Sequence, residues 1–152
     1  MRTPASIAGH PIHPMLVPIP IGLWIFSLFC DLMYFGGSTN PAWPTVALYT
    51  MCGGIVGALL AAVPGLIDLL SLPAHPRRTA LAHMTINLTV VALYVINVWM
   101  RQSAPESGSV PLWLSLIAIG LLVISGWLGG KMVYALGVAV DAPADATATV
   151  KK

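Results

Sequence analysis

Four long apolar stretches limit what this chain can fold into. They occupy about residues 15–36, 45–72, 79–100 and 112–136. Each exceeds the roughly 20 residues that a helix needs to cross a bilayer. Only 8% of the 152 residues are charged, whereas soluble domains carry about 25%. The sequence therefore predicts an all-α, polytopic membrane protein with four transmembrane helices, for which the lipid bilayer is the first partner.

The connections between the stretches are short, which predicts an up-down four-helix bundle. They cover about residues 37–44, 73–78 and 101–111. Pro14, Pro18 and Pro20 make the start of the first span irregular or kinked. We expect a single transmembrane domain over residues 1–140. The Ala-, Thr- and Asp-rich residues 141–152 are expected to form a disordered tail.

Basic residues are concentrated on one side of this topology. On that side are Arg2, Arg77, Arg78, Lys151 and Lys152, with Lys131 nearby. The opposite side carries only Arg101. Because positive residues mark the cytoplasmic side, both termini are expected in the cytoplasm. Seven basic residues scattered among apolar runs make no groove for nucleic acid.

The four histidines are the one feature that points to chemistry, because the topology puts all of them at the same membrane face. They are His10, His13, His75 and His83. An imidazole near the bilayer core is costly unless it has a partner. His83 begins a polar stripe that continues through Asn87, Val90, Tyr94 and Asn97. This helical spacing turns the stripe toward the protein interior. There His83 holds a cofactor or bonds to Asp68 or to a backbone carbonyl.

The first two histidines lie in a distinctive hexapeptide. It reads Gly9-His10-Pro11-Ile12-His13-Pro14. Proline disfavours the helical region for the residue before it, so both histidines are expected in extended or turn backbone, rigidly placed at the start of the first span. Rigid placement suits a ligand site, whereas the alternative is an interfacial cap. His75 also precedes a proline, in the short second connection.

A haem b site between the first and third helices is the leading prediction. These helices are diagonal in a four-helix bundle, so a flat macrocycle between them can receive one histidine on each face. We expect His13 and His83 as the axial pair, with Asn87 one turn from His83. The chain lacks a Cys-x-x-Cys-His sequence, which excludes covalent haem attachment. The predicted role is electron transfer with a quinone or a partner redox protein.

The remaining basic side chains near this site have supporting roles in the prediction. His10 and His75 form a second pair, for another cofactor or for the haem propionates. Arg77 and Arg78 are also expected to meet propionates through charge-assisted hydrogen bonds.

Two other classes of function stay open. Three or four imidazoles suit a transition-metal ion such as zinc, copper or iron. The candidate ligands of such an ion are His10, His13, His75, His83 and Asp68. A structural or assembly subunit is the other class, because Gly53 with Gly57, and Gly126 with Gly130, form small-x-x-x-small pairs. They pack within the chain or against another copy in a homo-oligomer or larger complex. No nucleophile with a recognisable base is present, so an electron carrier or subunit is favoured over an enzyme.

Three residues deeper in the spans have ambiguous roles. Asp31 lies in the distal part of the first span, where a carboxylate is costly unless paired or protonated. It marks a proton or quinol position, or it bonds to Tyr34 or Asn40. Cys30 and Cys52 lie at similar depth in neighbouring spans, so they form a disulfide or act as two buried thiols.

Both ends of the chain carry sequence signatures. The hexapeptide is followed by Val17-Pro18-Ile19-Pro20-Ile21-Gly22-Leu23-Trp24 and then Asp31. The last span ends in Gly129-Gly130-Lys131-Met132-Val133-Tyr134, with Gly137-Val138 beyond it. In these residues the chain resembles a widespread bacterial family of predicted membrane proteins of unknown function, which implies the bacterial cytoplasmic membrane. At greater distance it is similar to di-haem b-type cytochromes with four-helix cores, which implies haem ligands among the histidines.

Overall fold

The computed structural model describes residues 2–103 and 108–140. Two short strands, β1 (Ser6–Ile7) and β2 (His10–Pro11), precede the helices. The helices are α1 (Ile12–Leu16), α2 (Pro18–Phe35), α3 (Ala42–Ser71), α4 (Ala74–Ser103) and α5 (Val110–Tyr134). With α1 and α2 taken together, the described residues form four segments that are long and apolar enough to cross a membrane. The predicted fold class is confirmed, whereas the predicted tail over 141–152 lies outside the described residues.

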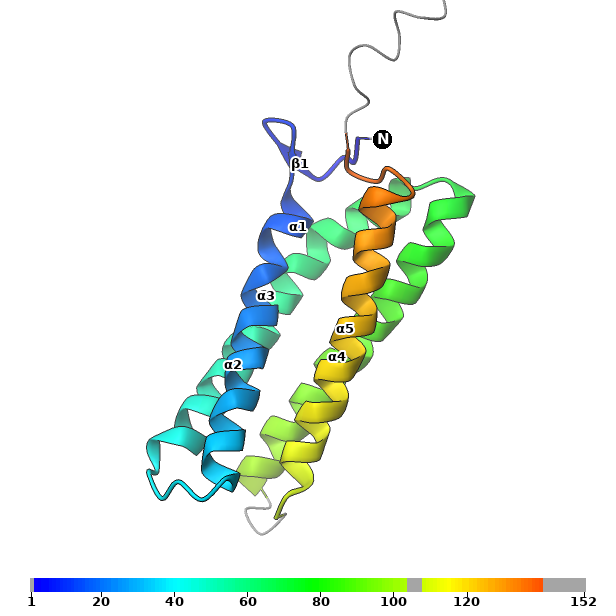
Figure 1. Ribbon diagram of the computed structural model, residues 1–152. Helices are drawn as coiled ribbons and strands as arrows, with labels where there is room; N and C mark the ends of the chain where they lie inside the picture. The colour runs from blue at the N-terminus through cyan, green and yellow to red at the C-terminus, as the bar shows by residue number, and fades with distance from the viewer. Residues whose placement is uncertain (1, 104–107, 141–152) are drawn as a thin grey trace, which may run out of the picture.

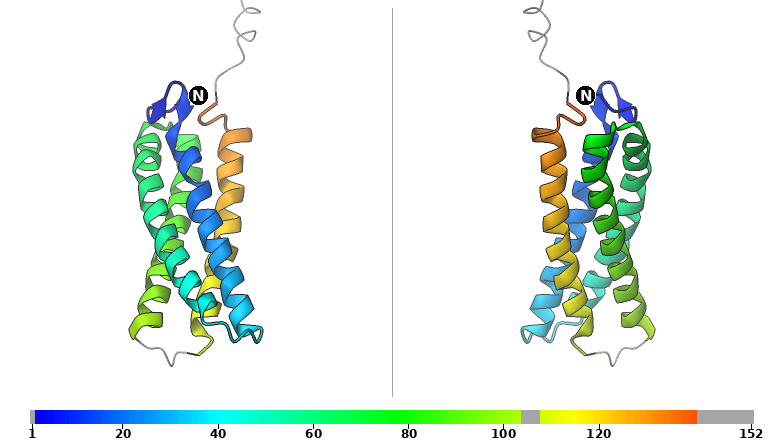
Figure 2. Two further views of the ribbon diagram at one scale, coloured as in Figure 1. Left: turned by 90° about the vertical axis from the view of Figure 1, so that its left-hand side faces the viewer. Right: turned by 90° about the vertical axis from the view of Figure 1, so that its right-hand side faces the viewer.

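The helices run up and down beside one another, as Figures 1 and 2 show. Helix α2 packs mainly on α3, and α4 mainly on α5. Narrower contacts of α3 with α4 and of α2 with α5 close the bundle. The antiparallel β1–β2 hairpin and the chain after α5 lie at the same end. We call this the hairpin end, and the opposite one the far end.

The break between α1 and α2 at Val17, before Pro18, confirms the irregular start of the first span. A following proline does not keep a histidine out of a helix, however, which corrects another prediction. His13 lies inside α1 and His75 inside α4, although each precedes a proline. A proline in a first helical turn removes no internal hydrogen bond, because the first N–H groups of a helix have no intrahelical partner. Helix α4 therefore begins at Ala74, earlier than the predicted residue 79. Only His10, in β2, has the expected extended backbone.

The glycine pair of α3 packs inside the chain, whereas Gly126 and Gly130 of α5 do not. A Cβ atom at Gly57 would lie 3.3 Å from Pro20 Cδ, and one at Gly65 would lie 2.7 Å from His13 Nδ1. The small residues on this face of α3 thus let α1 and α2 approach closely, as small residues do between membrane helices. At Gly126 and Gly130 an added Cβ would meet no described heavy atom within 4 Å.

The middle of the bundle is closed by aromatic and small apolar side chains. Trp24 and Tyr94 stack with ring centroids 4.5 Å apart, and the Trp24 indole donates a 3.3 Å hydrogen bond to the Met51 carbonyl. Val90 and Tyr94 are fully buried and Leu88 is exposed, so the predicted inward stripe of α4 is confirmed. Large apolar side chains cover much of the outer surface, as lipid contact requires.

Candidate functional site

Two of the four histidines meet inside the bundle near the hairpin end. The ring centroids of His13 and His83 are 6.2 Å apart, and the ring planes are at 88° to each other. His13 comes from α1 and His83 from α4, so the pair joins the first and third spans as predicted. Both residues are partly buried. We call these two side chains the imidazole pair.

Each ring is held by a backbone carbonyl of a neighbouring helix. The Nδ1 atom of His13 lies 2.8 Å from the Ala61 oxygen on α3, and that of His83 lies 2.9 Å from the Ser125 oxygen on α5. A carbonyl only accepts hydrogen bonds, so Nδ1 carries the proton in both rings. The Nε2 atoms then present lone pairs, which is the tautomer that metal-binding histidines adopt when a carbonyl holds the other nitrogen.

The Asn87 side chain hydrogen-bonds to the unprotonated nitrogen, Nε2, of His83. Its side-chain amide donates to His83 Nε2 at 3.0 Å and to the His83 carbonyl at 2.9 Å. The Ser125 hydroxyl also lies 2.9 Å from His83 Nδ1. Of the two partners predicted for His83 without a cofactor, the backbone carbonyl is present. Asp68 is engaged elsewhere, because its Oδ1 accepts the Ala5 N–H at 2.8 Å.

The other two histidines do not join the pair. His10 is exposed in the hairpin, and its Nδ1 lies 3.1 Å from the Ala8 oxygen. His75 is exposed in the first turn of α4, as are Arg77 and Arg78. Within residues 2–103 and 108–140, no three His, Cys, Asp or Glu side chains are grouped as metal ligands. The five residues proposed for a bare ion are therefore not gathered at one place.

A second polar centre lies at the far end, where an ion pair joins α2 to α4. The Arg101 Nη2 atom donates to Asp31 Oδ2 at 2.6 Å, and the Asp31 side chain is only 1% exposed. Arg101 also donates to Asn97 at 2.8 Å, and the Asn97 amide donates to the Pro111 carbonyl and the Ser115 hydroxyl. The prediction that Asp31 bonds to Tyr34 or Asn40 is wrong, because its carboxylate bonds to Arg101.

Arg101 is the residue that the sequence reasoning missed. Its position in the sequence marks it only as the lone basic residue of the opposite membrane face, yet it lines a cavity of about 330 Å³ at the far end. Tyr34, Phe35 and Leu48 contribute apolar surface to the same cavity. Cys30 and Cys52 are both free thiols, and Cys30 is buried whereas Cys52 is only partly buried. The predicted disulfide is therefore absent, and the interpretation as two buried thiols holds for Cys30.

Gly65 is required for the position of His13, which gives the first testable prediction. In Gly65→Ala the new Cβ would lie 2.7 Å from His13 Nδ1, so the ring must leave the Ala61 carbonyl. We expect a loss of about 1–3 kcal/mol from overpacking, measured by thermal unfolding in detergent. Gly130→Ala is the matched control, because nothing described lies within 4 Å of its Cβ. Equal stability of both variants would contradict the close packing of His13 on α3.

With this geometry described, the comparisons with known proteins assign the family. The profile described as "Predicted membrane protein (DUF2231)" matches residues 9–142. The chain belongs to the DUF2231 family. This match spans both polar centres of the DUF2231 fold, and its description names no activity. No curated protein and no solved structure matches the chain. The distant similarity to b-type cytochromes stays a prediction.

Proposed function

We propose that this DUF2231 protein binds one haem b through the imidazole pair and transfers electrons in the membrane. The observation that carries the proposal is the approach of His13 and His83 from opposite sides of the bundle, with ring centroids 6.2 Å apart. Metal–imidazole bonds are about 2.0–2.1 Å long, so His13 and His83 would hold one iron between them with ring centres roughly 6 Å apart. The spacing of the pair fits a shared iron.

The number and state of the ligands also favour haem over a bare ion. A haem iron takes one or two ligands from the protein, whereas a zinc ion is bound by three or four. The pair supplies two nitrogens, and both Nδ1–H groups are already held by carbonyls. Small residues, Gly65 and Gly129, lie against the two rings, so α3 and α5 pack closely on them.

The chain's own side chains then have distinct tasks. Bound haem supplies the one-electron redox chemistry. Ala61 and Ser125 fix the ring orientations through their carbonyls. Asn87 bonds to both Nε2 and the backbone oxygen of His83, so it can release Nε2 to a ligand and keep a partner. The electron partner is a quinone or another membrane redox protein, and the hairpin end faces the cytoplasm of a bacterial cell.

An absorption spectrum of the purified protein tests this proposal. The full chain is produced in cells supplied with haem precursor and purified in mild detergent. We expect a Soret band, α and β bands after dithionite reduction, and about one haem per chain in a pyridine haemochrome assay. A colourless protein with one transition-metal ion per chain by mass spectrometry would replace haem with a metal site. A protein with neither would favour the assembly role.

A further inference from the structure

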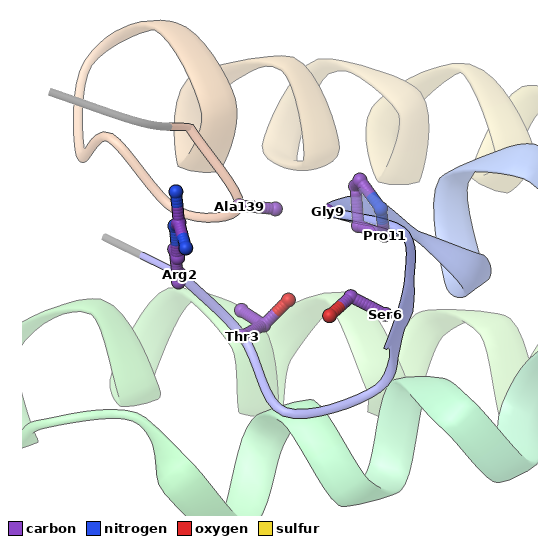
Figure 3. Close-up of a pocket in the computed structure, with 6 residues that line it drawn as sticks. All are labelled: Arg2, Thr3, Ser6, Gly9, Pro11 and Ala139. Atoms are coloured by element: carbon purple, nitrogen blue, oxygen red, sulfur yellow. The ribbon is translucent and has the colours of Figure 1, made fainter. Parts of the chain in front are cut away.

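The cavity at the far end is larger than the one at the hairpin end. The hairpin-end cavity has a volume of about 130 Å³ and lies between the N-terminal segment and the chain after α5 (Figure 3). The six lining residues that Figure 3 labels are Arg2, Thr3, Ser6, Gly9, Pro11 and Ala139. A cavity of about 150 Å³ holds one benzene ring, so this space is too small for a substituted ring. The far-end cavity, with about 330 Å³, has room for one.

Aromatic and apolar side chains form most of the far-end cavity. Tyr34 and Phe35 come from the last turn of α2, and Leu48 comes from α3. A wall of this kind with few polar groups is typical of sites for small organic molecules. Tyr34 and Phe35 are 44% and 43% exposed, and they end the first apolar segment. The cavity is therefore open at the surface of the bundle near the membrane boundary, where a lipid-soluble molecule can enter.

Arg101 supplies hydrogen-bond donors to this cavity without a net charge. Its Nε atom donates to Asn97 at 2.8 Å and its Nη2 atom to Asp31 at 2.6 Å, so Asp31 neutralises the guanidinium. The third nitrogen, Nη1, bonds to no described residue. The buried side-chain nitrogen and oxygen atoms that lack a partner among the described residues are Thr3 Oγ1 and Tyr94 Oη. Nη1 is therefore not buried, and its N–H groups are accessible.

These properties select an uncharged hydrogen-bond acceptor from the membrane. An accessible N–H donor needs an acceptor on the ligand, and a guanidinium already neutralised by a carboxylate does not call for an anion. The apolar walls disfavour strongly hydrated groups. The Thr45 hydroxyl also lines the cavity, but it donates to the Pro41 carbonyl at 3.2 Å, which leaves Arg101 as the accessible donor. A flat, uncharged ring with carbonyl oxygens meets all these conditions.

We infer that the far-end cavity binds the headgroup of a membrane quinone. The Arg101 Nη1 group donates to a quinone carbonyl, while Tyr34 and Leu48 contact the ring and the apolar tail extends into lipid. The inference names the redox partner in the proposed function and rests on that function for its electron-transfer role, whereas the binding itself needs no haem.

Thermal unfolding of the full chain in mild non-ionic detergent tests the inference. The probe is decyl-ubiquinone, and decylbenzene is the matched probe that has a ring and a tail but no carbonyl. We expect the unfolding midpoint to rise with the concentration of decyl-ubiquinone, because a ligand that binds only the folded state stabilises it. No rise with the quinone, or an equal rise with decylbenzene, overturns the inference.

This readout separates the quinone site from the haem site. A colourless protein that binds decyl-ubiquinone would remove only the haem proposal. A haem-loaded protein that does not bind decyl-ubiquinone would remove only the quinone site.

Variants of the lining make the test specific. Leu48→Trp fills the cavity and is expected to weaken quinone binding about tenfold. Leu60→Trp is the matched control, because it makes the same change on α3 at a position that is 60% exposed and outside the cavity lining. Arg101→Lys is a second variant, which keeps a charge beside Asp31 but loses the forked donors, and it should also weaken binding about tenfold. Unchanged quinone affinity in either variant, once it is shown to fold, overturns the inference.

Discussion

Replacing His83 with alanine is expected to abolish haem binding while the helical bundle persists. The substitution removes one of the two proposed iron ligands and the bond from the ring to the Ser125 carbonyl. It leaves the contacts of α4 with α5 elsewhere in place, because Val90 and Tyr94 are buried further along the helix. The measurement is the Soret absorbance per chain, together with helical circular dichroism and gel-filtration behaviour.

His75→Ala is the control for this prediction. His75 lies on the same helix but is exposed in the first turn, so this variant should keep the full Soret band. Haem occupancy equal to wild type in His83→Ala would remove His83 as a ligand. Loss of haem in both variants would point to a general defect in haem loading rather than to the imidazole pair.

Arg101→Met is expected to be the most destabilising single substitution at the far end. It leaves the Asp31 carboxylate, which is 1% exposed, without its cationic partner. Removing one member of a buried ion pair costs about 3–5 kcal/mol, because the remaining charge is uncompensated. Asn97 also loses the donor to its side-chain oxygen. Unfolding in mixed micelles with increasing dodecyl sulfate measures the loss.

A double variant distinguishes charge from packing. Asp31→Asn combined with Arg101→Met removes both charges, so it should recover much of the stability lost in Arg101→Met. Lys131→Met is the control, because Lys131 is exposed and contacts only the face of Trp127 among its described interactions. A double variant less stable than Arg101→Met would show that the cost does not come from the unpaired carboxylate.

The sequence was sufficient for the spans and for the inward face of α4, because both follow from local periodicity. It was insufficient for the partner of Asp31. Arg101 was placed just outside a span predicted to end at residue 100, whereas α4 continues to Ser103. This extra turn puts Arg101 inside the bundle. Two charges separated by 70 positions in the sequence give no local pattern that would pair them.

The histidines show a similar limit. Counting spans correctly gathered all four toward one membrane face, yet only His13 and His83 meet. Their meeting depends on Gly65, which leaves space for the His13 ring against α3. His75 lies in the first turn of α4 and is exposed. The depth of each histidine along the bundle was predictable from the sequence, whereas the direction of each side chain depends on helix packing.

The link between Asp31 and Arg101 has a consequence for how the protein enters the bilayer. Synthesis proceeds at about 5–20 residues per second, so the 70 positions between these residues correspond to a delay of roughly 4–14 s. During that interval the first span carries a lone carboxylate that hydrocarbon disfavours. The first two spans must therefore wait at the insertion machinery, or remain near water, until the third span emerges. Biogenesis of this small protein is thus expected to be a concerted event rather than a helix-by-helix one.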